Sequence, residues 1–321
     1  VALLSNTTGA DNTSVGSGSL LTNTTGASNV AVGKDALKRN TTAANNVAVG
    51  INALCANTTG AGNVAIGCGA LCKNTTASGN VAVGREAGIS NTTGANNTFI
   101  GENALSNNTT ADGNVAVGMK AMVSNTTGAG TTAVGFEASC KNTTGDNNTT
   151  YGFRAGFAIT TGTLNTNIGT IAGNAVTTGS NNLILGYNAQ ATAVGVSNEI
   201  TLGNGNNDNL RCADTSISAL SDLRDKKNIK DIPHGLDYIL ALRPVKFDWN
   251  TRDGTRKGKK DYGFIAQELD KVETDFGSAE YTRLVHKDNP EKWEADVMKT
   301  YPILIKAIQE LKKEIDLLKN K

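Results

Sequence analysis

The first two-thirds of the chain lack the residues from which catalytic and ion-binding sites are usually built. Of the 30 basic and 29 acidic residues, only 18 precede residue 212, and both histidines, both tryptophans and all four prolines lie beyond it. Net charge is +1, which gives no electrostatic basis for nucleic-acid binding, and no apolar run is long enough to span a membrane. We therefore predict no cofactor, no metal site, no nucleic-acid partner and no membrane insertion.

What this region does contain is a strict repeat. A glycine closes each N-V-A-V-G-like unit and recurs every 17 residues from Gly16 to Gly203, without an insertion. An apolar residue precedes this glycine in every unit, an Asn stands four positions before it in ten of twelve units, and an N-T-T triplet recurs in a fixed phase. A fixed period of this kind indicates a stacked architecture.

The repeat predicts a mainly β fold. Val-x-Val alternation is typical of a short strand with one buried face, and Gly and N-T-T-G supply turns. We expect two short strands and two turns in each 17-residue coil, with the valines buried between stacked coils of a β-solenoid or β-roll. At about 4.8 Å per coil the rod would be roughly 50 Å long. Its core would be thin, so the rod would gain by packing against copies of itself.

The change in composition divides the chain into domains. We predict a solenoid shaft over 1–212, a junction over 213–220 and a compact α+β domain over 221–321, which is a normal domain length. The chain begins with Val1, which suggests a fragment of a longer protein.

Two repeated features allow more than one interpretation. Cys55 and Cys72 share a phase with Cys140 and should stack on neighbouring coils, where they are either small apolar fillers or a disulfide. The N-T-T triplets match glycosylation sequons, but turn residues must also recur because the coil recurs. Asn and Thr ladders along the stack would satisfy one another by hydrogen bonding.

One place in the chain could support chemistry. Ser221 is followed five residues later by Lys226, in "ALSDLRDKKNIKDI". A lysine can activate a serine when desolvation lowers its pKa from about 10.4 towards neutrality. From the spacing alone, a Ser–Lys dyad and a solvated charged turn both remain open.

A resemblance favours the dyad. "SDLRDKKNI" resembles the S-D-x-R-x-K-x-N-I start of the endosialidase-type intramolecular chaperone domains at the C-termini of phage tail spikes and fibres. Three further blocks agree in order: "LDYILALRPVKFDW", "DYGFIAQEL" and "YPILIKAIQEL". In that family the domain drives trimerisation and folding of the fibre ahead of it and then cuts itself off.

The resemblance implies particular roles for residues at the start of the domain. The cut would fall between Leu220 and Ser221, with Ser221 as nucleophile and Lys226 as base, a serine peptidase that acts once on its own chain and on no external substrate. Asp222, Arg224 and Asn228 match supporting motif positions. Asp225 stands where the family often has an apolar residue, and a carboxylate beside Lys226 favours the charged amine, which opposes its use as a base.

The end of the chain predicts a helix over about 301–319. Its apolar residues follow alternating three- and four-residue steps, which is a coiled-coil seam, with Pro302 in the first turn and Thr300 as the cap. The a-Ile, d-Leu pattern favours two strands by itself, whereas the family implies three. The seam residues, which could alternatively pack on their own domain, are Leu304, Ile308, Leu311, Ile315 and Leu318.

Together these features predict a homotrimeric fibre or spike segment of a virus, with a chaperone at its C-terminus and a host cell-surface receptor, glycans included, as target. It would be part of the virion, outside the cell. The repeats also resemble the head domains of trimeric surface adhesins, so a bacterial cell-surface adhesin is the alternative. An ice-binding solenoid is a further one, because Thr rows on a flat β face can match ice.

Overall fold

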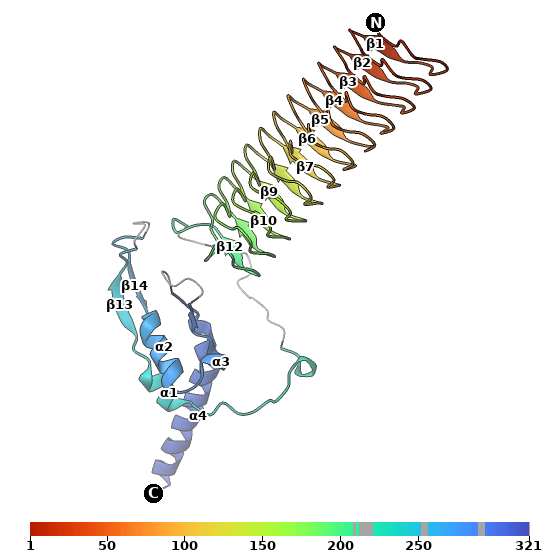
Figure 1. Cartoon of the computed structure of the whole chain (residues 1–321). Helices are drawn as coiled ribbons and strands as arrows, with labels where there is room; N and C mark the ends of the chain where they lie inside the picture. Colours follow the sequence, from red (N-terminus) through yellow and green to blue (C-terminus); the bar gives the residue numbers. More distant parts are fainter. Residues whose placement is uncertain (208–209, 212–220, 252–255, 288–292, 321) are drawn as a thin grey trace. The chain divides into compact units, whose positions relative to one another are not determined.

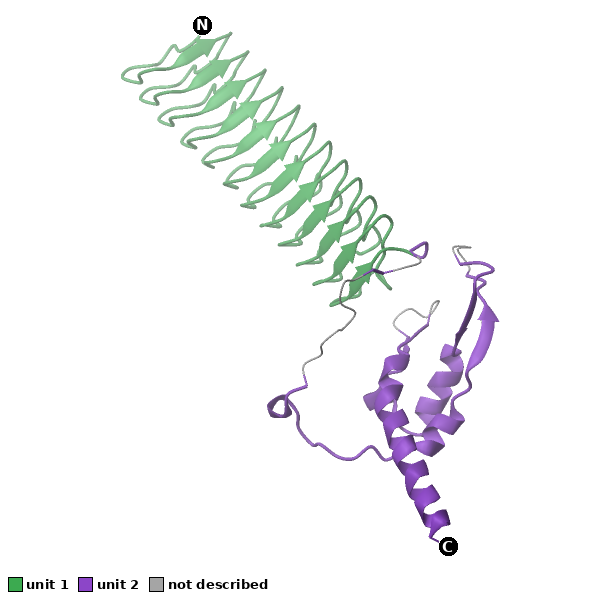
Figure 2. Ribbon diagram, turned by 180° about the vertical axis from the view of Figure 1, so that it is seen from behind, with its two compact units in different colours: residues 1–204 green, residues 205–321 purple. Residues whose placement is uncertain are grey.

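The computed structural model describes residues 1–207, 210–211, 221–251, 256–287 and 293–320. It contains two compact units, Val1–Asn204 (unit 1) and Gly205–Lys321 (unit 2), coloured separately in Figure 2. The predicted junction at 213–220, with Leu220, lies outside the described residues.

Unit 1 is a parallel β-solenoid in which every coil adds one strand to a single sheet of twelve (Figure 1). Each strand pairs in register with the residues 17 positions further on, as Val30–Val32 does with Val47–Val49. The strands are β1 (Thr13–Val15), β2 (Val30–Val32), β3 (Val47–Val49), β4 (Val64–Ile66), β5 (Val81–Val83), β6 (Thr98–Ile100), β7 (Val115–Val117), β8 (Thr132–Val134), β9 (Thr149–Tyr151), β10 (Thr166–Ile168), β11 (Leu183–Leu185) and β12 (Ile200–Leu202).

The prediction of two strands per coil was wrong, because the remainder of each coil is folded by left-handed residues. In the coil that follows β2, Asp35 and Leu37 have φ of 56° and 47°, and Asn45 has φ of 62°. Backbone in this region cannot continue as a strand. Each coil therefore has one three-residue strand and a tightly turned return path.

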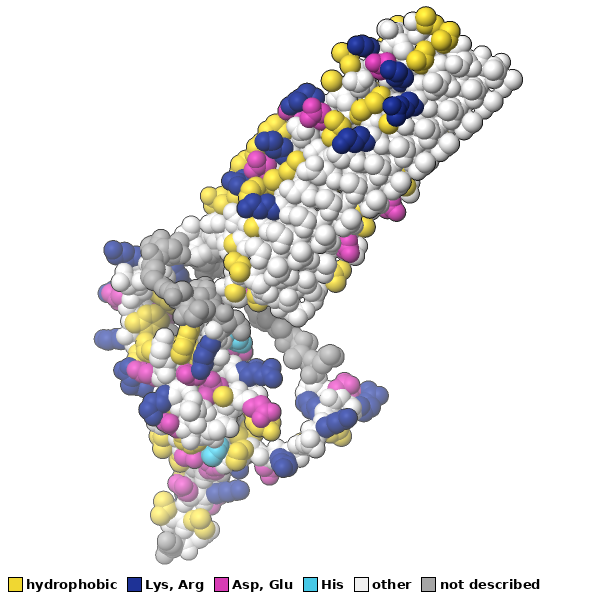
Figure 3. Space-filling model, in the orientation of Figure 1, with side chains coloured by type: hydrophobic (Ala, Val, Ile, Leu, Met, Phe, Trp, Pro, Cys, Tyr) yellow, Lys and Arg dark blue, Asp and Glu magenta, His cyan; other side chains and the backbone are white. Residues whose placement is uncertain are grey.

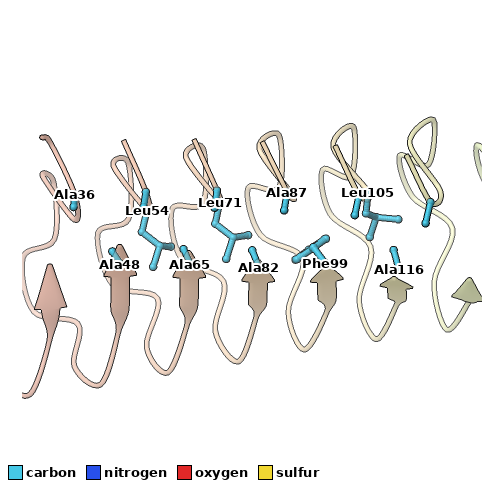
Figure 4. Packing of buried hydrophobic residues seen from close by; sticks show 14 of the residues in the cluster. Ala36, Ala48, Leu54, Ala65, Leu71, Ala82, Ala87, Phe99, Leu105 and Ala116 are labelled. Carbon is cyan, nitrogen blue, oxygen red and sulfur yellow. The ribbon is translucent and has the colours of Figure 1, made fainter. Parts of the chain in front are cut away.

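The prediction that the strand valines are buried was also wrong. In β2 to β11 the middle residue of the strand, such as Ala48 or Ala65, is buried, whereas the residues on either side of it are partly exposed; in the two end strands the middle residue is only half-buried, and Val15 is 57% exposed. The core lies between these alanines and leucines from the opposite turn, which point toward one another in Figure 4. Val-x-Val alternation fixed the two faces of the strand but did not reveal which one is inside.

Volume is conserved across this thin core. Leu54, Leu71 and Leu105 are each followed eleven residues later by an alanine in the next strand. Where the strand instead carries Phe99, the residue eleven before it is Gly88, and a Cβ there would lie 3.1 Å from the Phe99 ring. A large residue on one side is thus matched by a small one on the other, as close packing requires.

The glycine that sets the period lies where no side chain fits. Gly50 has φ of 134°, and a Cβ on it would lie 2.5 Å from the carbonyl oxygen of Gly67 in the next coil. Both the conformation and the close approach of two backbones require glycine.

Two asparagine ladders run along the stack, as the sequence predicts. In the first, Asn57 Nδ2 donates to Asn40 Oδ1 (3.0 Å) and to the Gly60 carbonyl (2.9 Å). In the second, the backbone N–H of Asn63 donates to Asn46 Oδ1 (2.9 Å). The Asn of the N-T-T triplet is fully buried from Asn23 to Asn142. Its amide is occupied inside the folded coil, which supports a turn role rather than glycosylation.

Unit 2 is a small α+β domain. It contains η1 (Leu223–Asp225), α1 (Leu236–Ala241), β13 (Val245–Asp248), β14 (Lys260–Gly263), α2 (Ala266–Asp275), α3 (Ala279–Thr282), β15 (Val285–His286), β16 (Glu294–Ala295), η2 (Val297–Lys299) and α4 (Thr300–Lys319). β13 and β14 form one antiparallel hairpin, and β15 and β16 form another. The core consists of Tyr238, Leu269, Leu284 and Ile303.

The long C-terminal helix is α4, and it packs against α1. Its start differs from the prediction, because Thr300 is the first helical residue and caps nothing. The Thr300 hydroxyl instead donates to the Val297 carbonyl (2.6 Å), and Asp296 caps the preceding turn by accepting from Met298 N–H (3.0 Å). Sequence spacing alone did not show that a 3-10 turn precedes the helix.

Candidate functional site

The predicted dyad lies at the first described residues after the junction. The 3-10 turn η1 carries the chain back on itself, so Lys226 Nζ donates a hydrogen bond of 2.6 Å to Ser221 Oγ. Five residues of extended chain would separate these groups by more than the reach of a side chain pair. The turn is therefore what brings the nucleophile candidate and the base candidate together.

Asp222 and Arg224 hold this turn. Asp222 Oδ1 caps η1 by accepting from Arg224 N–H (2.8 Å), and its two oxygens also accept from Arg224 Nε (3.0 Å) and Nη2 (2.6 Å). This side-chain pairing lowers the pKa of Asp222 and raises that of Arg224. Asn228, with φ of 54°, ends the segment in the left-handed conformation that Asn tolerates well. The supporting roles that the motif implies for Asp222, Arg224 and Asn228 stay predictions.

The environment of the dyad is open. Every residue from 221 to 233 is exposed in the single chain, Lys226 included. The Lys226 amine donates to the Ser221 hydroxyl oxygen in this arrangement. Leu220, the other side of the expected cleavage site, lies outside the described residues.

The expected seam of α4 does not pack on its own domain. Ile303 and Ala307 face the core of unit 2, while Leu304, Ile308, Leu311, Ile315 and Leu318 are 41–70% exposed. The helix therefore has one face buried in its own domain and a second apolar face toward solvent. Such a face is typical of a surface that another chain covers.

Unit 1 has an apolar row as well. The residue before each glycine that sets the period, from Gly16 to Gly203, is apolar in all twelve coils and points out of the solenoid, with Tyr151 59% and Leu202 53% exposed. On the side of unit 1 seen in Figure 3, charged side chains gather along one edge, and a broad neighbouring face carries none. The apolar residues before the glycines are visible in the sequence, but their exposure was not predicted because the valines were assigned to the core.

Within the residues that the structure describes, no group of three or more His, Cys, Asp or Glu side chains could hold a metal ion. Over the same residues, no helix has the length and apolar character needed to cross a membrane.

Comparison with family models finds a match within unit 2. Residues 221–278 match the model of a family described as chaperone of endosialidase (Peptidase S74). The match begins at Ser221, extends through the "DYGFIAQEL" block, and leaves the repeats and residues 279–321 outside. Neither the curated proteins nor the solved structures contain a match to the chain.

Proposed function

Because a chaperone-of-endosialidase domain follows a long β-solenoid here, as is typical of phage tail fibres, we propose that the chain is a homotrimeric fibre or spike segment of a phage virion. Its exposed shaft would belong to the part of the particle that contacts a host cell-surface receptor, glycans included. The single observation that carries the proposal is the family match that starts at Ser221, directly behind the repeats.

A shaft of identical coils needs a device that sets its alignment. Strands in neighbouring chains could pair one coil out of register with almost no loss of contacts, because each coil presents the same groups 17 residues later. A nucleus that joins three chains at one end removes this ambiguity and lowers the entropic cost of bringing them together. We assign that role to unit 2.

Two exposed apolar surfaces support assembly in threes. The α4 seam would pack in a short coiled coil. The outward-pointing apolar residues that precede the period-setting glycines would pack along the shaft axis. Both surfaces expose apolar area in one chain and would lose it in a trimer, which is favourable at about 25 cal/mol per Å².

Cleavage at Leu220–Ser221 would follow assembly. With Lys226 neutral, its amine takes the proton from Ser221 Oγ as the oxygen attacks the Leu220 carbonyl carbon. The C–N bond to Ser221 breaks, its nitrogen receives the proton, and Leu220 becomes an ester on Oγ. Water then hydrolyses this ester and leaves a carboxylate on Leu220 and a free hydroxyl on Ser221.

The exposure of the dyad couples the two steps. In the single chain Lys226 is exposed and its amine donates to Ser221 Oγ, whereas a base at this position must accept the serine proton. A neighbouring chain that covers residues 221–233 would remove water from the amine and favour its neutral form. Cleavage would then begin only in assembled chains, which protects the folding nucleus until its work is complete.

The test is to express the chain and follow it by denaturing gel, intact mass and light scattering. We expect a fragment of residues 221 to 321 that is absent in Ser221→Ala and Lys226→Ala, while Lys227→Ala, one residue further on, cleaves normally. Both uncut variants should still be trimers. An uncut wild type would remove the peptidase role, and monomers in every variant would remove the chaperone role.

Asp225 offers a second test of the same chemistry. Asp225→Asn removes a negative charge next to Lys226 without changing the size of the side chain. The neutral form of the Lys226 amine should then form at a lower free-energy cost, so cleavage should be several-fold faster than in wild type in a time course. A slower variant would show that Asp225 assists the reaction instead.

A further inference from the structure

Two cysteines of the shaft face each other across neighbouring coils. Cys55 and Cys72 lie five residues after Gly50 and Gly67, the period-setting glycines of their coils, in the turn opposite the sheet, and both are partly buried. Their Sγ atoms are 2.7 Å apart, and Cys55 Sγ lies 3.4 Å from the Cys72 carbonyl oxygen. Neither the fibre nor the chaperone function uses these thiols.

The fold holds the pair at a distance suited to a bond. Ala56 N–H donates to the Cys72 carbonyl (3.0 Å), which fixes the spacing of the two turns next to the cysteines. Stacked coils are about 4.8 Å apart, inside the Cα–Cα range of about 4.4 to 6.8 Å that disulfides span. The chain contains a matched comparison, because Cys140 has the same phase but Val123 and Phe157 as its neighbours along the stack.

The two thiols are electrostatically unequal. The hydrogen bond from Cys72, against the effect of burial and with a smaller contribution from Arg39, lowers the pKa of Cys55 to about 7. The same hydrogen bond and burial raise the pKa of Cys72. Near neutral pH a substantial share of Cys55 is therefore thiolate, the reactive form, while Cys72 is a thiol.

A small oxidant can reach the pair. A surface hollow of about 320 Å³ is lined by Cys55 and Cys72 together with Asp35, Lys38, Arg39 and Lys73. Asp35 pairs with Lys38 at 3.1 Å, so the rim has an excess of positive charge. This suits an anionic low-molecular-weight disulfide such as oxidised glutathione.

We propose that Cys55 and Cys72 are an oxidisable pair that an anionic low-molecular-weight disulfide converts into a bridge between adjacent coils. The Cys55 thiolate attacks one sulfur of oxidised glutathione, whose S–S bond breaks and releases a glutathione thiolate. Cys72 gives its proton to that thiolate, attacks Cys55 Sγ and releases the second glutathione. Counted from the Cys55 thiolate, the protein loses two electrons and the one proton of Cys72, and the oxidant becomes one glutathione thiol and one glutathione thiolate. The disulfide would link two adjacent coils covalently when the chain passes from reducing to oxidising surroundings.

Mass spectrometry of the full chain tests the proposal. The reduced protein is equilibrated with oxidised glutathione, alkylated with iodoacetamide under denaturing conditions and digested with trypsin, which places Cys55, Cys68 and Cys72 in the peptide of residues 40–73. We expect this peptide to carry a single alkyl group, at Cys68, and an otherwise unmodified mass lower by about 2 Da. Fragmentation should locate the bridge between Cys55 and Cys72.

Variants provide the controls. Cys140→Ser should leave the bridge unchanged, and Cys55→Ser should abolish it. Oxidation should raise the melting temperature of wild type and of Cys140→Ser but not that of Cys55→Ser. Three alkyl groups on the 40–73 peptide, separate glutathione adducts on the two cysteines, or disulfide-linked dimers on a non-reducing gel would each overturn the proposal. The wild-type peptide decides the matter even if Cys55→Ser fails to fold.

Discussion

The two units differ in whether their stabilising contacts repeat along the chain. In unit 1 each coil bonds to the coils 17 residues before and after it, through the same ladders and the same small core of alanine and leucine. Unit 2 has no repeat, and four different large side chains, Tyr238, Leu269, Leu284 and Ile303, form its core. A repeated set of contacts is easy to extend but cannot specify where pairing starts, whereas a unique set can. On the proposed function, the alignment of the shaft would be set by unit 2.

The largest expected effect separates the two units. A chain of residues 1 to 220 keeps every ladder of the shaft but loses the proposed nucleus, so refolding should give misregistered or aggregated material. Size-exclusion chromatography with light scattering measures the outcome, with the full-length Ser221→Ala variant as the uncut control. Clean trimers of the truncated chain would mean that the repeats align themselves.

A smaller change in unit 2 should weaken assembly without unfolding the unit. Ile308→Asp places a charge in the α4 seam at a position that is 59% exposed in the single chain and that the proposed trimer would bury. We expect monomers with unchanged helical content by circular dichroism. Gln309→Asp, the next residue and also exposed, is the matched control and should remain trimeric.

Within unit 1, the volume rule of the core predicts a rescue. Phe99→Ala leaves a cavity and should cost about 3–5 kcal/mol in urea unfolding. Adding Gly88→Leu restores the Leu–Ala pair found in neighbouring coils, where Leu71 and Leu105 adopt the same left-handed backbone, with φ of 49° and 48°. The double variant should recover most of the loss, while Gly88→Leu alone should clash with the Phe99 ring. Additive losses would refute the compensation.

The smallest expected effect concerns one rung of a ladder. Asn74 Nδ2 donates to Asn57 Oδ1 and to the Ala77 carbonyl, and Asn74 Oδ1 accepts from Asn91, all at 3.0 Å. Asn74→Ala leaves these buried groups without partners and should cost about 1–3 kcal/mol. Asn6, the first rung, is only half-buried, so Asn6→Ala should cost clearly less in the same unfolding experiment. Equal losses would show that burial does not set the strength of the ladder.

Much of unit 1 could be predicted because its period is visible in the sequence. The glycine spacing indicated a solenoid, and the recurring Asn indicated ladders. The orientation of the strand could not be predicted, since alternation defines two faces without naming the inner one, and alanine rather than valine fills the interior. The match between Gly88 and Phe99 also escaped notice, because the two residues come together only when the return path of the coil is known.

The candidate site divides in a similar way. The motif placed Ser221 and Lys226 five residues apart, but the turn that joins them was not predicted, because the hydrogen bonds between Asp222 and Arg224 appear only in the folded chain. The exposure of Lys226 could not be read from the motif, because solvation depends on what surrounds a residue rather than on its neighbours in sequence. In the proposed mechanism the action of the base would depend on a second chain, and one sequence does not encode its own partners' positions.

The row of glycines also constrains how such a shaft can change over generations. A side chain at Gly50 would clash with the backbone of the next coil, so a single substitution at these positions would disrupt the stacking of two coils. Recombination between repeats, by contrast, inserts or deletes a complete coil and leaves every remaining contact intact. Lineages carrying this shaft should therefore vary in length by whole coils while the glycine row stays invariant, and a virus could adjust its reach without redesigning its fold.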